Sequence, residues 1–307
     1  MTIPETQQLD DRDAPLFGDN FLETLEYLHI IARKILSGQL KAERRSRQKG
    51  VSVEFADHRP YAPGDDFRFI DWNVFFRTEQ LFLKLFEEEE DLHIYLLLDC
   101  SGSSDFGMPY KFHFLRRMAA AIGYLGLAGL DRVYVIPFKD SLPQTAAGML
   151  QVRSKGKVFR LLNFLEGLKP EGETNLNACM KTFSGSKVKR GLAVLLSDLY
   201  DTNGAITALN TLRYQKFDTF VVHCVSPQEA EPALLGDLRL LDCENDRFRD
   251  ITVTEGMLRK YRETFQGYCS SVEQFCRSKA IGYVRCRTDQ AFQDVVIQML
   301  RREKFLQ

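Results

Sequence analysis

The pattern of hydrophobic and polar positions divides the chain near residue 92. From there onward, short apolar runs are separated by longer segments whose apolar residues recur at helical spacing. The runs have the near-continuous hydrophobicity of parallel strands buried on both faces, and they cover residues 92–98, 133–138, 192–196, 217–225 and 281–286. The amphipathic segments cover residues 110–130, 158–168, 176–183, 206–212, 255–280 and 291–305. This alternation predicts an α/β fold in which a doubly wound, mainly parallel sheet is flanked by helices.

The pattern before residue 92 is different. Residues 21–36 carry apolar side chains at helical spacing, and Gly38 is the expected end of that helix. Apolar and polar residues alternate over 51–55, which predicts a strand, and a second strand is expected at 82–85.

These patterns predict two parts of unequal size. Residues 1–90 are expected to form an N-terminal extension of a helix and β-strands, and residues 91–307 an α/β domain. Within that domain we expect a short edge strand at 142–147 and an inserted β-hairpin at 237–253.

The composition narrows the class of protein. The 307 residues are 44% hydrophobic and 27% charged, with a formal net charge of -1. This balance argues against nucleic acid or an anionic membrane as the main partner, so the basic residues at 41–49 are interpreted as a solvated loop. The longest apolar tract, 118–130, is too short to cross a bilayer, and residues 1–20 show no secretory signal. A cytoplasmic protein is therefore expected, with its seven cysteines as buried thiols because no CxxC pair is present.

Side chains that carry oxygen follow two of the predicted strands. Asp99, Ser101 and Ser103 come directly after the first apolar run, Asp198 follows the third, and Thr174 stands in a loop before a predicted helix. Because the carboxyl ends of neighbouring parallel strands meet at one edge of a sheet, we expect these five residues to converge. Oxygen ligands suit a hard cation such as Mg²⁺. The alternative is structural, since serine and threonine after a strand also form turns and helix caps.

This set of residues resembles a known type of metal site. The order DxSxS, then Thr, then Asp, seen here as Asp99, Ser101, Ser103, Thr174 and Asp198, is similar to the metal-ion-dependent adhesion site (MIDAS) of von Willebrand factor type A (vWA) domains. The resemblance implies that the two serines bind Mg²⁺, Mn²⁺ or Ca²⁺ directly and that the threonine binds directly or through water. It implies that the two aspartates act mostly through water and through hydrogen bonds to the serine hydroxyls. An ion held mainly by neutral hydroxyls keeps much of its charge and attracts a partner's carboxylate.

A second resemblance lies upstream. Residues 55–72, followed by Phe76-Arg77-Thr78, are similar to the signature R-x-Y-x-x-GD-x-x-R-x-IDW of a bacterial family called domain of unknown function 58, in which the segment precedes a vWA domain. The resemblance implies a link to MoxR-type AAA+ ATPases, with this chain as adaptor or co-chaperone. Two roles stay open for the segment, ion pairing that joins the extension to the α/β domain, which is favoured, or a partner surface. Its candidate residues are Arg59, Tyr61, Asp65, Arg68, Asp71, Trp72 and Arg77.

Two functions compete on this basis. The first is a non-enzymatic, metal-dependent protein-interaction module that works with an AAA+ ATPase. The second is a Mg²⁺-dependent hydrolase or phosphoryl-transfer enzyme that uses Asp99 or Asp198. The sequence favours the first, because it contains no GxSxG, Walker A or HExxH motif. In addition, Ser101 stands where an aspartate-nucleophile phosphatase would have its second aspartate.

Overall fold

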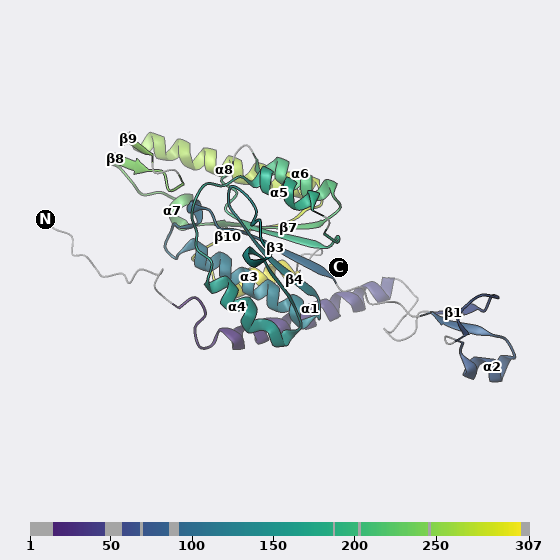
Figure 1. The fold of residues 1–307 in the computed structure, drawn as a ribbon. Coiled ribbons are helices and arrows are strands. Elements are labelled where there is room, and N and C mark those ends of the chain that lie inside the picture. Colours follow the sequence, from purple (N-terminus) through teal and green to yellow (C-terminus); the bar gives the residue numbers. More distant parts are fainter. Residues whose placement is uncertain are drawn as a thin grey trace. The chain divides into compact units, whose positions relative to one another are not determined.

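The computed structural model describes residues 15–46, 57–67, 70–85, 92–186, 188–201, 204–244 and 247–301. The chain forms two compact units, and Figure 1 shows the elements of both. The larger unit contains the described residues up to Arg33 and from Leu92 onward, and the smaller unit those between Lys34 and Asp91.

Helix α1 (Phe21–Ser46) begins in the larger unit. The Phe21 ring packs 5.6 Å from that of Phe292, and the His29 ring lies 6.4 Å from that of Tyr124. Residues 21–33 therefore belong with the α/β domain, and not with the extension of residues 1–90 in which the sequence pattern placed them.

The prediction that this helix ends at Gly38 was wrong. Helix α1 continues through Gly38 to Ser46. A glycine inside a helix costs only about 1 kcal/mol relative to alanine, and the residues that follow Gly38 include the strong helix formers Leu, Lys, Ala, Glu and Arg. The strand expected at 51–55 lies outside the described residues.

The larger unit is built on a six-stranded sheet in the order β10-β7-β6-β3-β4-β5. All neighbouring strands are parallel except the edge strand β5, which pairs antiparallel with β4. The strands are β3 (His93–Asp99), β4 (Arg132–Phe138), β5 (Leu150–Arg153), β6 (Leu192–Ser197), β7 (Asp218–Val225) and β10 (Gly282–Arg287). The predicted fold class, a doubly wound and mainly parallel sheet flanked by helices, is confirmed.

Helices cover both faces of this sheet (Figure 1). Helices α5 (Leu176–Gly185), α6 (Ala205–Tyr214) and α8 (Glu255–Ser278) share one core with the sheet, into which β3 contributes Tyr95 and Leu97. On the other face lie α3 (Lys111–Ala128), α4 (Val158–Glu166) and α9 (Phe292–Arg301). There α3 approaches Leu96 closely at Gly123, which has no side chain. A Cβ atom at Gly123 would lie 3.3 Å from the Leu96 Cδ1 atom. Strand β3 is therefore buried on both faces, as its continuous hydrophobicity predicted.

The edge strand was predicted in the wrong place. Residues 150–153 form β5, and residues 142–147 do not form a strand. Leu150 and Val152 are buried while Gln151 and Arg153 are exposed, so the period of two that marks a half-buried strand begins at Leu150.

The inserted hairpin formed where it was expected. Strands β8 (Gly236–Leu241) and β9 (Phe248–Val253) pair antiparallel, with Leu241 opposite Phe248. Val253 is the buried residue of these two strands, whose other side chains are partly or fully exposed.

Among the helices of the described residues, none has the length and apolar character needed to cross a membrane.

Candidate functional site

The carboxyl end of β3 is organised around the side chain of Asp99. One carboxylate oxygen, Oδ1, accepts hydrogen bonds from the Ser101 backbone N–H (3.0 Å) and from the Ser101 hydroxyl (2.7 Å). The other oxygen, Oδ2, accepts the hydroxyl of Ser197, the last residue of the neighbouring strand β6, at 2.6 Å. Asp99 thus fixes the Ser101 hydroxyl and ties the ends of two parallel strands together.

The electrostatic environment of Asp99 is unusual. Its side chain is fully buried, and this burial, together with the nearby charge of Asp198, raises the pKa of the carboxyl to about 7 against the opposing hydrogen bonds from Ser197 and Ser101. Among the ion pairs of the described residues, none includes Asp99. The carboxyl is therefore held by neutral donors in a place where its charge is poorly compensated.

The two serines predicted as ligands lie together. A 3-10 turn at Gly102–Ser104 brings the Ser103 hydroxyl to 2.9 Å from that of Ser101. Gly102 is the first residue of this turn. Its N–H donates to the Gly172 carbonyl at 2.8 Å, and a Cβ atom here would lie 2.5 Å from the carbonyl oxygen of Cys243. Only glycine allows this close approach of two backbone segments.

Asp198 follows β6 at the same edge of the sheet. One of its oxygens accepts the Tyr200 backbone N–H at 3.1 Å, and the other accepts the ammonium group of Lys111 at 2.8 Å. Burial alone would raise the pKa of the Asp198 carboxyl, but the charge and hydrogen bond of Lys111 lower it below its ordinary value. Asp198 is therefore a buried carboxylate with a partner, unlike Asp99.

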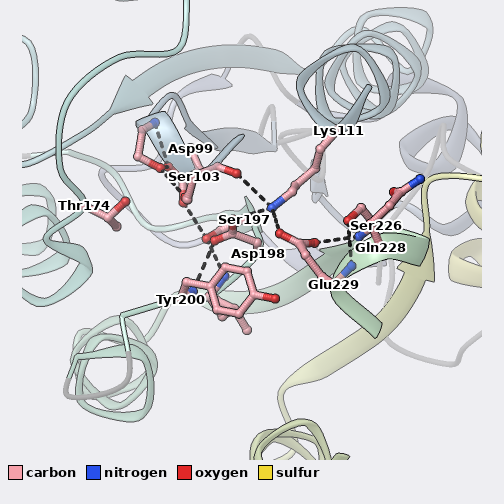
Figure 2. Close-up of polar contacts among 12 residues, drawn as sticks. Asp99, Ser103, Lys111, Thr174, Ser197, Asp198, Tyr200, Ser226, Gln228 and Glu229 are labelled. Atoms are coloured by element: carbon pink, nitrogen blue, oxygen red, sulfur yellow. Dashed lines mark hydrogen bonds and ion pairs between the residues drawn. The ribbon is translucent and has the colours of Figure 1, made fainter. Parts of the chain in front are cut away.

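Lys111 is the first of the residues at this site that the sequence pattern did not identify. It is the first residue of α3, it is fully buried, and its Nζ atom also donates to the Ser103 carbonyl (2.9 Å) and to Glu229 Oε1 (2.5 Å). Figure 2 shows the ammonium group between Asp198 and Glu229. Burial lowers the pKa of Lys111, but the two carboxylates outweigh it and raise the pKa above its ordinary value, so this lysine is charged. The same helix also contains His113, Arg116 and Arg117, so its sequence held no signal that distinguished Lys111.

Glu229 was missed as well. It lies in the short helix α7 (Pro227–Ala230), which follows β7, and its side chain accepts the backbone N–H of Ser226 at 2.7 Å. The Ser226 hydroxyl in turn accepts the Glu229 N–H, forming a capping box that fixes the carboxylate. Burial raises the pKa of Glu229 despite the charge of Lys111.

Thr174 reaches the site from the loop before α5. Its hydroxyl donates to Glu244 Oε1 at 3.1 Å. Glu244 follows the end of β8, and burial raises the pKa of its carboxyl while the Thr174 and Ser103 hydroxyls partly oppose the shift. The structure therefore brings to the site, beside Thr174, a residue that the sequence pattern placed only in a hairpin insertion.

The remaining predicted residues lie in the smaller unit, where β1 (Asp57–Pro60) pairs antiparallel with β2 (Phe82–Leu85). Arg59 forms an ion pair with Asp65 at 2.8 Å, and Asp65 also accepts the Ala62 backbone N–H at 2.9 Å. The Tyr61 N–H donates to the Leu81 carbonyl at 2.9 Å. The ion pair thus lies inside the segment, whereas the sequence reading expected pairing across the join.

Helix α2 (Trp72–Thr78) completes this unit. Asp71 caps it by accepting the backbone N–H groups of Asn73 (3.0 Å) and Val74 (3.3 Å). The Trp72 side chain is half exposed, and Arg77 lies in the last turn of the helix. Arg68 lies outside the described residues.

Comparison with known families matches residues 57–269 to the family described as protein of unknown function DUF58. Uncharacterized proteins of Mycobacterium bovis and Mycobacterium tuberculosis are each 22% identical to this chain over 269 residues, covering 86% of it and 84% of their own length.

Several solved structures are similar at a low level. The conserved hypothetical protein BatB from Bacteroides thetaiotaomicron is 12% identical, with a TM-score of 0.40, and 68% of this chain and 97% of that one are covered. An aerotolerance-related membrane protein from Bacteroides fragilis is 15% identical, with a TM-score of 0.41. The match covers 69% of this chain and 99% of that one. A von Willebrand factor type A protein from Catenulispora acidiphila is 11% identical, with a TM-score of 0.38 and coverages of 69% and 42%.

Proposed function

This chain belongs to the family of proteins of unknown function DUF58, and on that premise we propose that it is a non-enzymatic, metal-dependent protein-interaction module. Its α/β unit binds a partner's carboxylate through a divalent cation at the carboxyl ends of β3 and β6. Ser101, Ser103 and Thr174 supply hydroxyl ligands, and Asp99 and Asp198 orient them and the waters of the ion. Mg²⁺ is the expected ion, with Mn²⁺ or Ca²⁺ as substitutes.

The observation that carries this proposal is the pair of serine hydroxyls held 2.9 Å apart at the buried end of β3. Asp99 fixes the first hydroxyl from one side, and the 3-10 turn positions the second. Hydroxyl and carboxylate oxygens are the ligands that a hard cation prefers, whereas a soft site would need sulfur or nitrogen. Among the described residues no group of three or more His, Cys, Asp or Glu side chains is placed to hold a metal, so the proposed site depends on its hydroxyl ligands.

The balance of charge also supports a cation here. Asp99, Asp198, Glu229 and Glu244 face this edge of the sheet, and Lys111 is the cation that pairs with two of them. Asp99 and Glu244 have no ion-pair partner among the described residues, and removing a carboxylate from water without such a partner is costly. A divalent ion compensates that charge and, when bound, offers a positively charged ligand position to a partner's carboxylate.

The partner that fits the family resemblance is a MoxR-type AAA+ ATPase, with this chain as adaptor or co-chaperone. Under this proposal, the ATPase supplies the carboxylate that binds the ion. Co-purification of the full chain with the candidate ATPase, with and without EDTA, tests the pair, because a metal-dependent contact is lost when the ion is removed.

Calorimetric titration with Mg²⁺ and Mn²⁺ tests the site itself. Ser101→Ala is expected to abolish binding, and Asp198→Ala to weaken it strongly. Ser141→Ala, which removes an exposed hydroxyl that contacts Asp140, is the matched control and is expected to bind as the parent does. Equal affinities in all four proteins would overturn the proposal. The same samples test the enzymatic alternative, since phosphatase or ATPase turnover lost in Asp99→Ala would favour the enzyme.

A further inference from the structure

Glu244 is placed at the proposed cation site by the end of the inserted hairpin. The residues just after β8 form a turn, in which the Asp242 N–H donates to the Arg247 carbonyl at 2.9 Å. The Glu244 N–H donates to Asp242 Oδ1, also at 2.9 Å. These contacts fix the backbone of Glu244 at the end of the hairpin.

The carboxylate of Glu244 lies beside one of the hydroxyls that are proposed as direct ligands and near a second. The Thr174 hydroxyl donates to it at 3.1 Å, and the Ser103 hydroxyl is close enough to help lower its pKa. Thr174 and Ser103 are separated by 71 positions in sequence, so Glu244 lies where the two parts of the ligand set come together.

The position of Glu244 is supported by backbone packing. The carbonyl oxygen of the preceding residue, Cys243, approaches the turn after β3 so closely that a Cβ atom at Gly102 would lie 2.5 Å from it. The Gly102 backbone in turn bonds to the carbonyl of Gly172, in the loop that carries Thr174. Three backbone segments therefore meet beside Glu244, and their packing fixes the backbone from which the carboxylate extends.

Neutral donors alone hold this carboxylate among the described hydrogen bonds and ion pairs. The hydroxyl of Thr174 donates to it, whereas Lys111 pairs with Asp198 and Glu229. A half-buried carboxylate that faces other carboxylates gains more from a metal ion than from hydroxyl donors.

Building on the proposed function, we infer that Glu244 is the chain's own carboxylate ligand at the cation site. It occupies the ligand position that a partner's carboxylate needs, so the partner binds by replacing it. In the free protein the site is closed by its own chain, and a partner's acidic group competes with an internal one for a single position on the ion.

The strands of the hairpin bury little apolar surface. The side chains of β8 and β9 are mostly exposed, with Val253 as the buried one. Withdrawal of the Glu244 side chain, with the Cys243 backbone still packed at Gly102, therefore exposes little apolar surface of these strands.

Mn²⁺ binding and water proton relaxation of the full chain test the inference, because relaxation reports the number of water molecules on the ion. The variants are Glu244→Gln, Ser101→Ala and the control Glu173→Gln, which makes the same charge change at an exposed residue next to Thr174. Glu244→Gln is expected to bind Mn²⁺ about tenfold more weakly than the control, because one charged ligand is lost. The ion bound to Glu244→Gln is expected to relax water protons faster than the ion bound to the parent, since water takes the vacant position. Acetate is expected to displace this water and reverse the increase. It is expected to bind the ion of Glu244→Gln at a lower concentration than the ion of the parent.

The possible results separate the two proposals. If Ser101→Ala binds Mn²⁺ as the parent does, or the parent does not bind it, the proposed cation site is wrong. If Ser101→Ala loses binding while Glu244→Gln matches Glu173→Gln in affinity and relaxation, the site stands and the role of Glu244 is overturned.

Discussion

The Lys111 ammonium nitrogen lies 2.8 Å from Asp198 Oδ2, and the two side chains are 0% and 1% exposed. The pair places a fixed positive charge beside the proposed cation position. It neutralises one of the carboxylates there and holds Asp198 in a single orientation.

Replacement of Lys111 by Met is expected to destabilise the protein, because it leaves Asp198 and Glu229 buried without their cation. Breaking a buried ion pair from one side costs about 3–5 kcal/mol. Urea unfolding in EDTA measures this, with the exposed Lys181→Met as control. Equal stability of the two variants would contradict the structural role assigned to Lys111.

Mg²⁺ is expected to stabilise the folded protein. An ion that binds the native state alone contributes about 2.7 kcal/mol at one hundred times its dissociation constant. The thermal unfolding midpoint should therefore rise with Mg²⁺ and return with EDTA, while Ser101→Ala should show neither change. A rise of the same size in Ser101→Ala would place the ion elsewhere.

Gly102→Ala is expected to destabilise the larger unit by about 1–3 kcal/mol, because the new Cβ atom collides with backbone that cannot move like a side chain. The distance to the Cys243 carbonyl oxygen would be 2.5 Å. Gly267→Ala in α8 is the control, since nothing lies within 4 Å of a Cβ atom there and alanine favours helix. In urea unfolding, Gly102→Ala should lower the free energy of unfolding, and Gly267→Ala should raise it.

Stability is expected to fall in acid through His223. Burial lowers the pKa of this imidazole to about 4, while the charge of Asp198 partly opposes the shift. Between the ordinary pKa of 6.5 and this value, the unfolded chain binds a proton that the folded chain does not, so stability is lost as the pH falls. The loss reaches about 2 kcal/mol at pH 5.

His223→Gln should remove that part of the acid sensitivity. The variant also loses the contact between His223 Nδ1 and the Tyr283 hydroxyl at 2.8 Å, so it is expected to be less stable than the parent at pH 7. Urea unfolding at pH 7 and pH 5 measures the slope for each protein. A variant with the same slope as the parent would show that other groups control the acid response.

Asp71→Ala is expected to destabilise the smaller unit by about 1 kcal/mol, the usual cost of losing an N-cap. Asp71→Asn keeps an acceptor for the same backbone N–H groups and should stay close to the parent. Trp72 is the only tryptophan of the chain and lies in this unit, so its fluorescence follows the transition. Equal midpoints for the Ala and Asn variants would mean that the cap contributes little.

The sequence predicted the part of the site that follows from strand topology. Asp99 and Asp198 come directly after two strong apolar runs, and neighbouring parallel strands bring their ends together. Ser101 and Ser103 followed because they are local to the same strand end.

The parts that sequence missed depend on long-range placement. Lys111 lies 87 positions from Asp198, and nothing in an amphipathic pattern shows that the first residue of a helix points into a buried site. Glu244 lies between the two strands of a hairpin whose side chains are mostly exposed. The sequence pattern predicted the hairpin but held nothing to connect Glu244 with Thr174.

One consequence of the close approach at Gly102 is practical. Cys243, whose carbonyl meets that turn, is the exposed cysteine of the seven, and the other six are buried. A maleimide spin label or fluorophore added to the unaltered sequence will therefore attach next to Glu244. Its spectrum can follow the hairpin end directly as Mn²⁺, acetate or a partner is added, without an engineered labelling site.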